Sequence, residues 1–270
     1  MNAAQLARFD AAPMIDGVVP ERTEHATLIS GRSQVMTRSE LTALPIYEGT
    51  ETHKPVPHID LIRGIEMTLG EQGIYIAAEK FSVNRQGNAL FGVMDLKSSP
   101  ALPVTQGFSA AMGLRTANDK TMSIQLGVGA KVTICDNMAF NTDMIALKKK
   151  HTAGLDLITE LREAVKRFIE KFHKFSVNFD EMKNCPLTDT AAKVWIYDIF
   201  SKGEIAHKYF PAVHEAYFGT TVPYAGHVPY DTDFKNTLWA LHNSFTWALR
   251  TAPIPVQLAT TVHIAREFAI

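Results

Sequence analysis

Four adjacent residues, Lys148 to His151, carry the clearest chemical signal in the chain, because three lysines and a histidine stand together just before the longest helical pattern. In a strand, Lys148 and Lys150 share one face, and helical neighbours lie about 100° apart, so at least two ammonium groups meet the same solvent region. The free N–H groups of a helix entrance also attract anions and disfavour nearby lysine. We therefore interpret the segment as an anion site, with a nucleic-acid backbone as the leading ligand. A solvated charge run is the alternative.

A second candidate site lies in residues 112–123, which we predict as a turn before a β-hairpin. Arg115, Asn118 and Lys120 there supply a guanidinium, an amide and an ammonium, which can hold phosphate through bidentate and point contacts. In the alternative interpretation, Asp119 pairs with Arg115 or Lys120 and the turn binds nothing. Three phenylalanines near the predicted strands could stack on bases or simply fill the core, namely Phe81, Phe91 and Phe140.

Signals for catalysis or metal binding are weak. The chain has no glycine-rich phosphate loop, zinc-protease helix or nucleophile elbow. Its ten histidines are scattered, and its two cysteines, Cys135 and Cys185, form no Cys-x-x-Cys pair. We expect no cofactor, no metal and no catalytic residue. Two enzymatic alternatives stay open: a Cys135–His151 nucleophilic pair, and a nucleic-acid- or nucleotide-processing centre built on Asp119, Asp136, Asp143 or His151.

The elements that must position these residues indicate an α+β fold. Apolar spacing predicts a helix near residues 57–73, and "NRQGN" separates two β-rich runs within residues 74–98. Two more strands are expected over residues 121–130 and 131–140. Residues 155–175 then form a long helix with one apolar stripe. We predict an antiparallel sheet of about four or five strands backed by this helix.

The flanking segments complete three predicted regions. Residues 1–50 form an N-terminal arm, partly irregular, with a short turn at 37–44 that Ser39 can cap. Residues 51–185 form the α+β core, and residues 186–270 a helical C-terminal region packed on it. Within that region, helices are expected near 191–200, 206–218 and 234–251, with Thr188 or Asp189 capping the first. The tail after residue 254 is expected to be either helix or strand.

Composition limits the class of protein. Lys and Arg number 27 and Asp and Glu 28, so the net charge of −1 disfavours a dedicated duplex-DNA binder. A balanced protomer suits a self-assembling subunit, because strongly charged copies would repel one another. No apolar run approaches the ~20 residues that cross a bilayer, and the N-terminus lacks a secretory apolar region. We expect a cytoplasmic protein that does not bind membranes.

Several segments together resemble a known family. The turn 117–120, the strand end at 135–137, the basic-histidine segment 150–152 and the late helix with Trp239, Asn243 and Thr246 are similar to motifs of the phage/plasmid-like protein family (domain of unknown function 932). The resemblance covers roughly residues 55–250 and departs at Thr121 and Ser244. It carries no settled activity, but it implies a phage or plasmid setting in replication or recombination, and therefore the host cytoplasm if the protein is phage-encoded. The order of elements also resembles the single-strand annealing recombinases, which hold single-stranded DNA in a basic groove beside one long helix.

These observations predict a non-enzymatic protein that binds and anneals single-stranded DNA and assembles as a homo-oligomeric ring or filament. An interaction protein that inhibits or redirects a host defence or replication factor is the alternative. The residues expected to contact nucleic acid are Arg115, Asn118, Lys120, Lys131, Asn137, Lys148, Lys149, Lys150 and His151.

Overall fold

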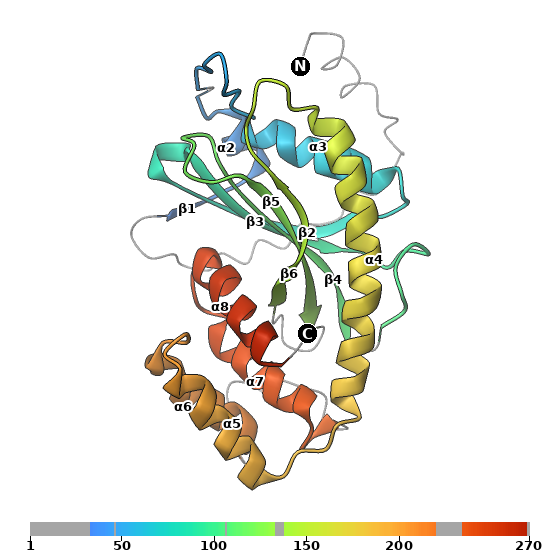
Figure 1. Cartoon of the computed structure of the whole chain (residues 1–270), viewed down its shortest axis with the longest axis vertical. Helices are drawn as coiled ribbons and strands as arrows, with labels where there is room; N and C mark the ends of the chain where they lie inside the picture. The colour runs from blue at the N-terminus through green and yellow to red at the C-terminus, as the bar shows by residue number, and fades with distance from the viewer. Residues whose placement is uncertain (1–32, 46, 106, 133–137, 220–233, 269–270) are drawn as a thin grey trace.

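The computed structural model of the chain describes residues 33–45, 47–105, 107–132, 138–219 and 234–268. A six-stranded antiparallel sheet with strand order β1-β2-β3-β4-β5-β6 forms its centre (Figure 1). Consecutive strands therefore neighbour one another throughout. The strands are β1 (Ser33–Met36), β2 (Ile76–Asn84), β3 (Ala89–Leu96), β4 (Phe108–Ala117), β5 (Ile124–Val132) and β6 (Met138–Lys149).

The sheet has two chemically different faces, because side chains alternate along each strand. The face that we call the inner face carries apolar side chains in register, as in the fully buried row Met94, Met112 and Val128. The opposite, outer face carries a row of larger and more polar side chains, which includes Arg115 and Gln125. The inner face belongs to the core, and part of the outer face is covered as well, since Val93 and Ala111 on that face are at most 3% exposed.

The long helix α4 (Leu157–Lys183) packs on the inner face. Its buried residues recur every three or four positions, which builds one continuous apolar stripe. Phe108 of β4 contacts this stripe, with ring centroids 6.3 Å from Phe172 and 5.0 Å from Phe179. Asp156 caps the helix by accepting a hydrogen bond from the backbone N–H of Thr159.

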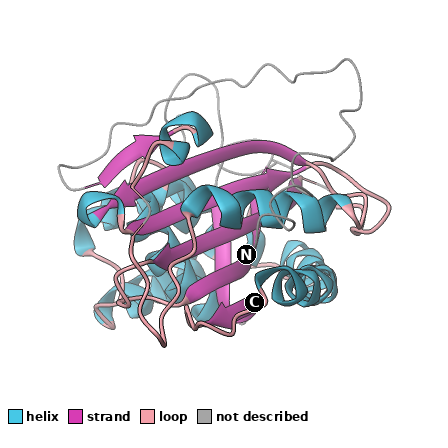
Figure 2. Cartoon of the chain, turned by 90° about the horizontal axis from the view of Figure 1, so that it is seen from above, coloured by secondary structure: helices cyan, strands magenta, loops and turns pink. Residues whose placement is uncertain are grey.

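Helix α3 (His58–Gly70) lies beside α4 (Figures 1 and 2). Gly64 permits the close approach, because a Cβ there would stand 2.8 Å from the Leu161 side chain. An ion pair between Glu71 and Arg162 joins the same two segments at the surface. The two helices and the inner face of the sheet belong to one continuous hydrophobic core.

The C-terminal region is helical, as predicted. It contains α5 (Asp189–Ser201), α6 (Phe210–Phe218), α7 (Leu238–Leu249) and α8 (Ile254–Glu267). Trp239 of α7 reaches the core of the sheet, with its ring 5.9 Å from Phe108 and 4.7 Å from Phe179. Helix α8 packs on β6 and β3, which resolves the predicted tail as helix. These helices gather at the end of the molecule opposite α3 (Figure 1).

Several boundaries differ from the prediction. Residues 112–117 are part of β4 and not of a turn, because Met112 and Leu114 pair with β3 and β5 in the core. Helix α4 continues past residue 175, since Phe179 and Met182 extend its apolar stripe. A capping box of Thr37 and Glu40, and not Ser39, starts the short helix α2 (Arg38–Thr42). Strand β1 lies within the predicted N-terminal arm. It adds a strand to the four or five that we predict, so the sheet has six.

Candidate nucleic-acid interface

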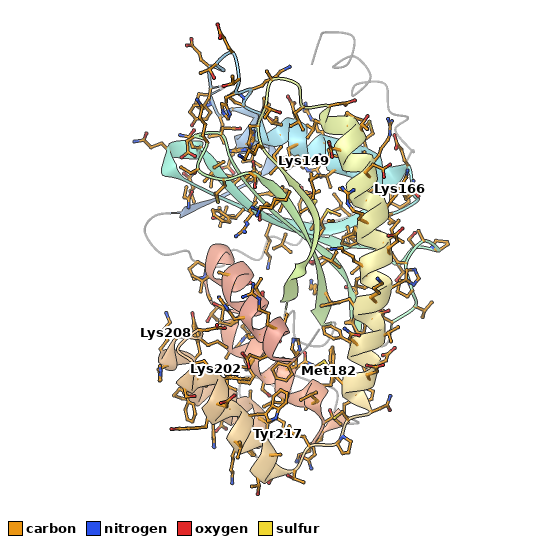
Figure 3. All side chains as sticks on the ribbon, viewed as in Figure 1. Lys149, Lys166, Met182, Lys202, Lys208 and Tyr217 are labelled. Carbon is orange, nitrogen blue, oxygen red and sulfur yellow. The ribbon has the colours of Figure 1, made fainter. Side chains whose placement is uncertain are left out.

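The alternation of β6 separates the adjacent lysines. Lys148 lies opposite Gln125 and joins the outer face, whereas Lys149 lies opposite the buried Ile124 and turns toward α4. The Lys149 Nζ is 2.7 Å from the Glu160 Oε1, so this charge is balanced by a carboxylate of the helix. Figure 3 shows Lys149 near the start of α4, at the other end of the molecule from Lys202 and Lys208. The cluster predicted from the sequence is therefore divided between two faces.

A row of four side chains crosses the outer face of the sheet. The strand register places Phe91 opposite Arg115, Arg115 opposite Gln125, and Gln125 opposite Lys148. We call these four residues the outer-face row. Neighbouring strands are separated by about 4.8 Å, so Arg115 and Lys148 stand roughly 10 Å apart on the same face. The row contains two cations and no acid.

Hydrogen bonds order the middle of this row. The Arg115 Nε donates to the Gln125 Oε1 at 2.8 Å, and the Gln125 Nε2 donates to the Ser123 Oγ at 2.9 Å. Gln125 thus holds the guanidinium against the sheet without neutralising it. Because only the Nε of Arg115 is used in this bond, its two terminal nitrogens still have donors for a second ligand.

The surroundings of the row are partly open. Phe91 and Gln125 are half-buried, and Lys148 is exposed. A Cβ added at Gly127, two residues from Gln125 on the same strand and face, would meet no atom within 4 Å. A planar group could therefore approach the backbone beside the row. Phe81, another candidate for base stacking, is buried in the core on the inner face. The side chain of Phe140 lies outside the described residues.

Lys131 lies on the outer face but carries a partner. Its Nζ donates to the Asp95 Oδ2 at 2.7 Å, and Asp95 is buried. An ion pair of this kind is costly to break, because the carboxylate would be left without its counter-charge in the interior. Lys131 therefore stabilises the sheet in this conformation.

The turn after β4 begins at Asn118. Lys120 is exposed and adopts a left-handed backbone with φ of 69°. Asp119 accepts a hydrogen bond from the backbone N–H of Thr121, which closes the turn. Lys120 and Lys150 thus lie in the segments that continue β4 and β6 at this end of the sheet, and both are exposed.

Asn118 and His151 lie in the interior. The Asn118 Oδ1 accepts from the backbone N–H of Val56 at 3.0 Å, and the His151 Nε2 lies 2.8 Å from the Thr116 Oγ1. Both residues are less than 10% exposed. Burial, followed by the nearby His53 and His58, lowers the pKa of His151 to about 4, so the ring is neutral at pH 7. Neither side chain offers a charge to a ligand on the outer face.

The enzymatic alternatives gain no support from the described residues. Asp119 is engaged in its own turn and His151 is buried. Among the side chains that the structure describes, no group of three or more His, Cys, Asp or Glu could hold a metal ion. The remaining candidates, Asn137, Cys135 and Asp136, lie outside the described residues, as does the side chain of Asp143.

The late-helix motif is structural in this fold. Trp239, Asn243 and Thr246 of α7 are buried. The Asn243 Nδ2 donates to the Trp239 carbonyl at 2.9 Å, and the Thr246 Oγ1 donates to the Asn243 carbonyl at 3.1 Å. These side chains stabilise the helix and its packing, and they lie away from the outer-face row.

Gln125 is the member of the row that sequence reasoning missed. An isolated glutamine carries no signal for function. Its place between Arg115 and Lys148 follows only from the register of β4, β5 and β6, which requires the exact strand pairing.

Comparison with known proteins places the chain in a family. Residues 49–263 match the model of the family described as Domain of unknown function (DUF932), and the chain belongs to that family. No curated protein and no solved structure matches the chain. Within the described residues, no helix combines the length and apolarity needed to cross a membrane.

Proposed function

We propose that the chain is a non-enzymatic protein that binds and anneals single-stranded DNA with the outer face of its sheet. The observation that supports this proposal is the outer-face row, in which one aromatic ring, one guanidinium, one amide and one ammonium group lie in register across four strands. Each has a defined use on a single strand, and the row presents no carboxylate that would repel phosphate.

The chemistry follows from the groups in the row. The Arg115 guanidinium, oriented by Gln125, can bind one phosphate through its free terminal nitrogens, and Lys148 can bind another as a point charge. The partly exposed ring of Phe91 offers a surface on which a base can stack. The open space above Gly127 leaves room for a base beside the amide. Exposed Lys120 and Lys150 would extend the contact beyond the sheet.

The proposal rests on fewer residues than the sequence predicted. Lys131 and Lys149 each carry a carboxylate partner, and Asn118 and His151 are buried. Two to four cations give one chain only weak binding to a strand. We therefore include self-association in the proposal, because several copies along one strand would add their contacts while each keeps its balanced charge. A phage or plasmid setting in recombination or replication belongs to the same proposal.

Annealing needs no cofactor in this account. Bound cations reduce the repulsion between two phosphate backbones, and contacts made mainly to one backbone leave base edges available for pairing. The protein would act by holding the strand in an extended form.

A salt titration tests the proposal. Binding of a fluorescent single-stranded oligonucleotide should weaken steeply with salt, and log Kd plotted against log salt should have a slope of about 0.7 for each phosphate contacted. The double variant Arg115→Gln, Lys148→Gln should flatten this slope, whereas Lys208→Gln, an exposed lysine on the C-terminal helices, should not. Absence of binding by the parent protein at low salt would overturn the proposal.

A second candidate function has one observation in its favour. Val194 and Tyr197 lie three residues apart on α5 and are 61% and 73% exposed. Exposed apolar side chains of this size are typical of protein contacts. An interaction protein that targets a replication or defence factor would lose partner binding on Tyr197→Ser and would be indifferent to Arg115→Gln.

A further inference from the structure

Three histidines meet inside the molecule next to the segment that carries Lys150. His53 precedes α3, His58 begins α3, and His151 follows β6; their side chains are 8%, 4% and 4% exposed. The rings of His53 and His151 have centroids 5.6 Å apart. We call these three residues the histidine cluster. Nothing in the proposed DNA contact uses it.

Two of the rings donate to backbone carbonyl oxygens. The His53 Nε2 lies 2.9 Å from the Asn118 carbonyl oxygen, and the His58 Nε2 lies 2.8 Å from the Gly87 carbonyl oxygen. A carbonyl oxygen only accepts, so both Nε2 atoms carry hydrogen. The Nδ1 of His58 and that of His151 are buried and make no hydrogen bond. Protonation would therefore place a new N–H donor in the interior without an acceptor.

The cluster joins two segments that are far apart in the chain. The backbone N–H of Lys54 donates to the His151 carbonyl at 3.1 Å, and that of Ala153 donates to the Thr52 carbonyl at 3.3 Å. His53 and Thr152 form the bridge between these bonds. The loop of residues 52–57 is thus fastened to the linker of residues 150–156, which connects β6 to α4.

We propose that the histidine cluster is a pH-sensitive latch, which holds the 150–156 linker against the 52–57 loop when His58 and His151 are neutral and releases it when they are protonated. Release would free the chain from residue 150, directly after the end of β6, and so loosen one end of the outer-face row; this consequence rests on the proposed function, whereas the latch itself does not.

Electrostatics at the cluster favour release in acid. Burial, together with His53 and His58, lowers the pKa of His151, and burial lowers that of His58. A proton on one ring raises the cost of a proton on the next. The elements that meet here also carry the charged side chains of Glu51, Lys54, Asp60, Arg63, Glu66, Arg115, Asp119, Lys120, Lys148, Lys149, Lys150 and Asp156. Asp156 is committed to the cap of α4, and Asp119 to its own turn.

Hydrogen exchange measured on the full chain tests the latch. The backbone amides of Lys54 and Ala153 report on it directly, and the amides of β3 and β4 report on the sheet. After correction for the intrinsic exchange rate, the opening constant at Lys54 and Ala153 should rise as the pH falls from about 6.5 to about 4. The expected rise is about tenfold per pH unit for each imidazole that titrates. The sheet amides should stay protected over this range.

Two variants and one control identify the groups responsible. His151→Gln removes one titrating ring and should make the pH dependence at Lys54 and Ala153 about tenfold per pH unit shallower. His173→Gln, at an exposed position on α4, should leave it unchanged, and Asp60→Asn should do the same because a carboxyl group is not the switch. If His151→Gln fails to fold, the parent protein still decides the question.

Two results would overturn the latch: protection at Lys54 and Ala153 that does not change with pH, or protection lost only together with that of β3 and β4. The exchange experiment contains no DNA, so its failure leaves the proposed function intact. A failed salt titration would likewise leave the latch standing.

Discussion

At the scale of single residues, the neighbouring side chains determine which cations are exposed to a ligand and which histidines are buried. Lys148 and Lys149 are neighbours in sequence, yet one lies on an open face and the other pairs with Glu160. His151 stands two residues further on and is buried and neutral. Strand alternation and one helix carboxylate thus give Lys148, Lys149 and His151, three of four consecutive residues, three different environments.

Acid should destabilise the protein through His151. Its pKa is about 4 in the folded state and about 6.5 in an unfolded chain, so the unfolded state binds more protons below pH 6.5. The stability that the neutral ring contributes is complete above pH 6.5 and is lost as pH falls toward 4, by up to about 3 kcal/mol. Urea unfolding of the parent and of His151→Gln across this range measures the difference. Equal slopes for both proteins would contradict the assignment.

At the scale of elements, close packing between secondary-structure units sets which positions tolerate change. Gly92 of β3 lies on the inner face between Phe81 and Leu114. Phe172 of α4 lies under the sheet, whereas Val177, five residues later on the same helix, is 56% exposed. A substitution at a packed position can therefore be compared with one at an open position of the same sheet or helix, and the difference measures the contribution of packing.

Gly92→Ala should destabilise the fold. The added Cβ would stand 2.7 Å from the Phe81 Cδ1, which belongs to a rigid buried ring, so we expect a loss of about 1–3 kcal/mol. Gly127→Ala is the matched control in the same sheet, because a Cβ there meets nothing within 4 Å. Thermal unfolding of both variants measures the contrast, and an equal loss of stability would refute this view of the inner face.

Phe172→Ala should cost about 3–5 kcal/mol, because the ring is 1% exposed and contacts Phe108, Phe168 and Phe175. Val177→Ala, on the solvent side of α4, should stay within about 0.5 kcal/mol. Chemical denaturation gives both values. A small effect at Phe172 would mean that α4 is not seated on the sheet as described.

At the scale of the whole molecule, local sequence patterns predict the helices and strands better than they predict which of these elements are in contact. The helices 58–70 and 157–183 and the β2–β3 hairpin follow from apolar spacing and turn residues, and the α+β class follows from their order. Residues 112–117 of β4 fall within the predicted turn, because the small residues of this strand carry no clear alternation. The partners of Lys131 and Lys149, the burial of Asn118 and the place of Gln125 depend on register and on contacts between distant segments, which a single sequence does not specify.

Assembly on DNA is expected at this scale. Each chain has a net charge of −1 and two cations in the outer-face row, so we expect a stable complex to need several copies on one strand. Light scattering should show particles larger than one chain when single-stranded DNA is present at low salt, and the Arg115→Gln, Lys148→Gln variant should form fewer. Particles of unchanged size in the presence of DNA would contradict self-association.

The central claim is that single-stranded DNA lies on the outer face of the sheet, and the two neighbouring lysines test it most directly. The affinity of Lys148→Gln and of Lys149→Gln for the same labelled strand should be measured across a range of salt concentrations. The account predicts that Lys148→Gln weakens binding and reduces the salt slope by about 0.7, while Lys149→Gln leaves both near the parent values. Equal losses, or a larger loss at Lys149, would contradict it.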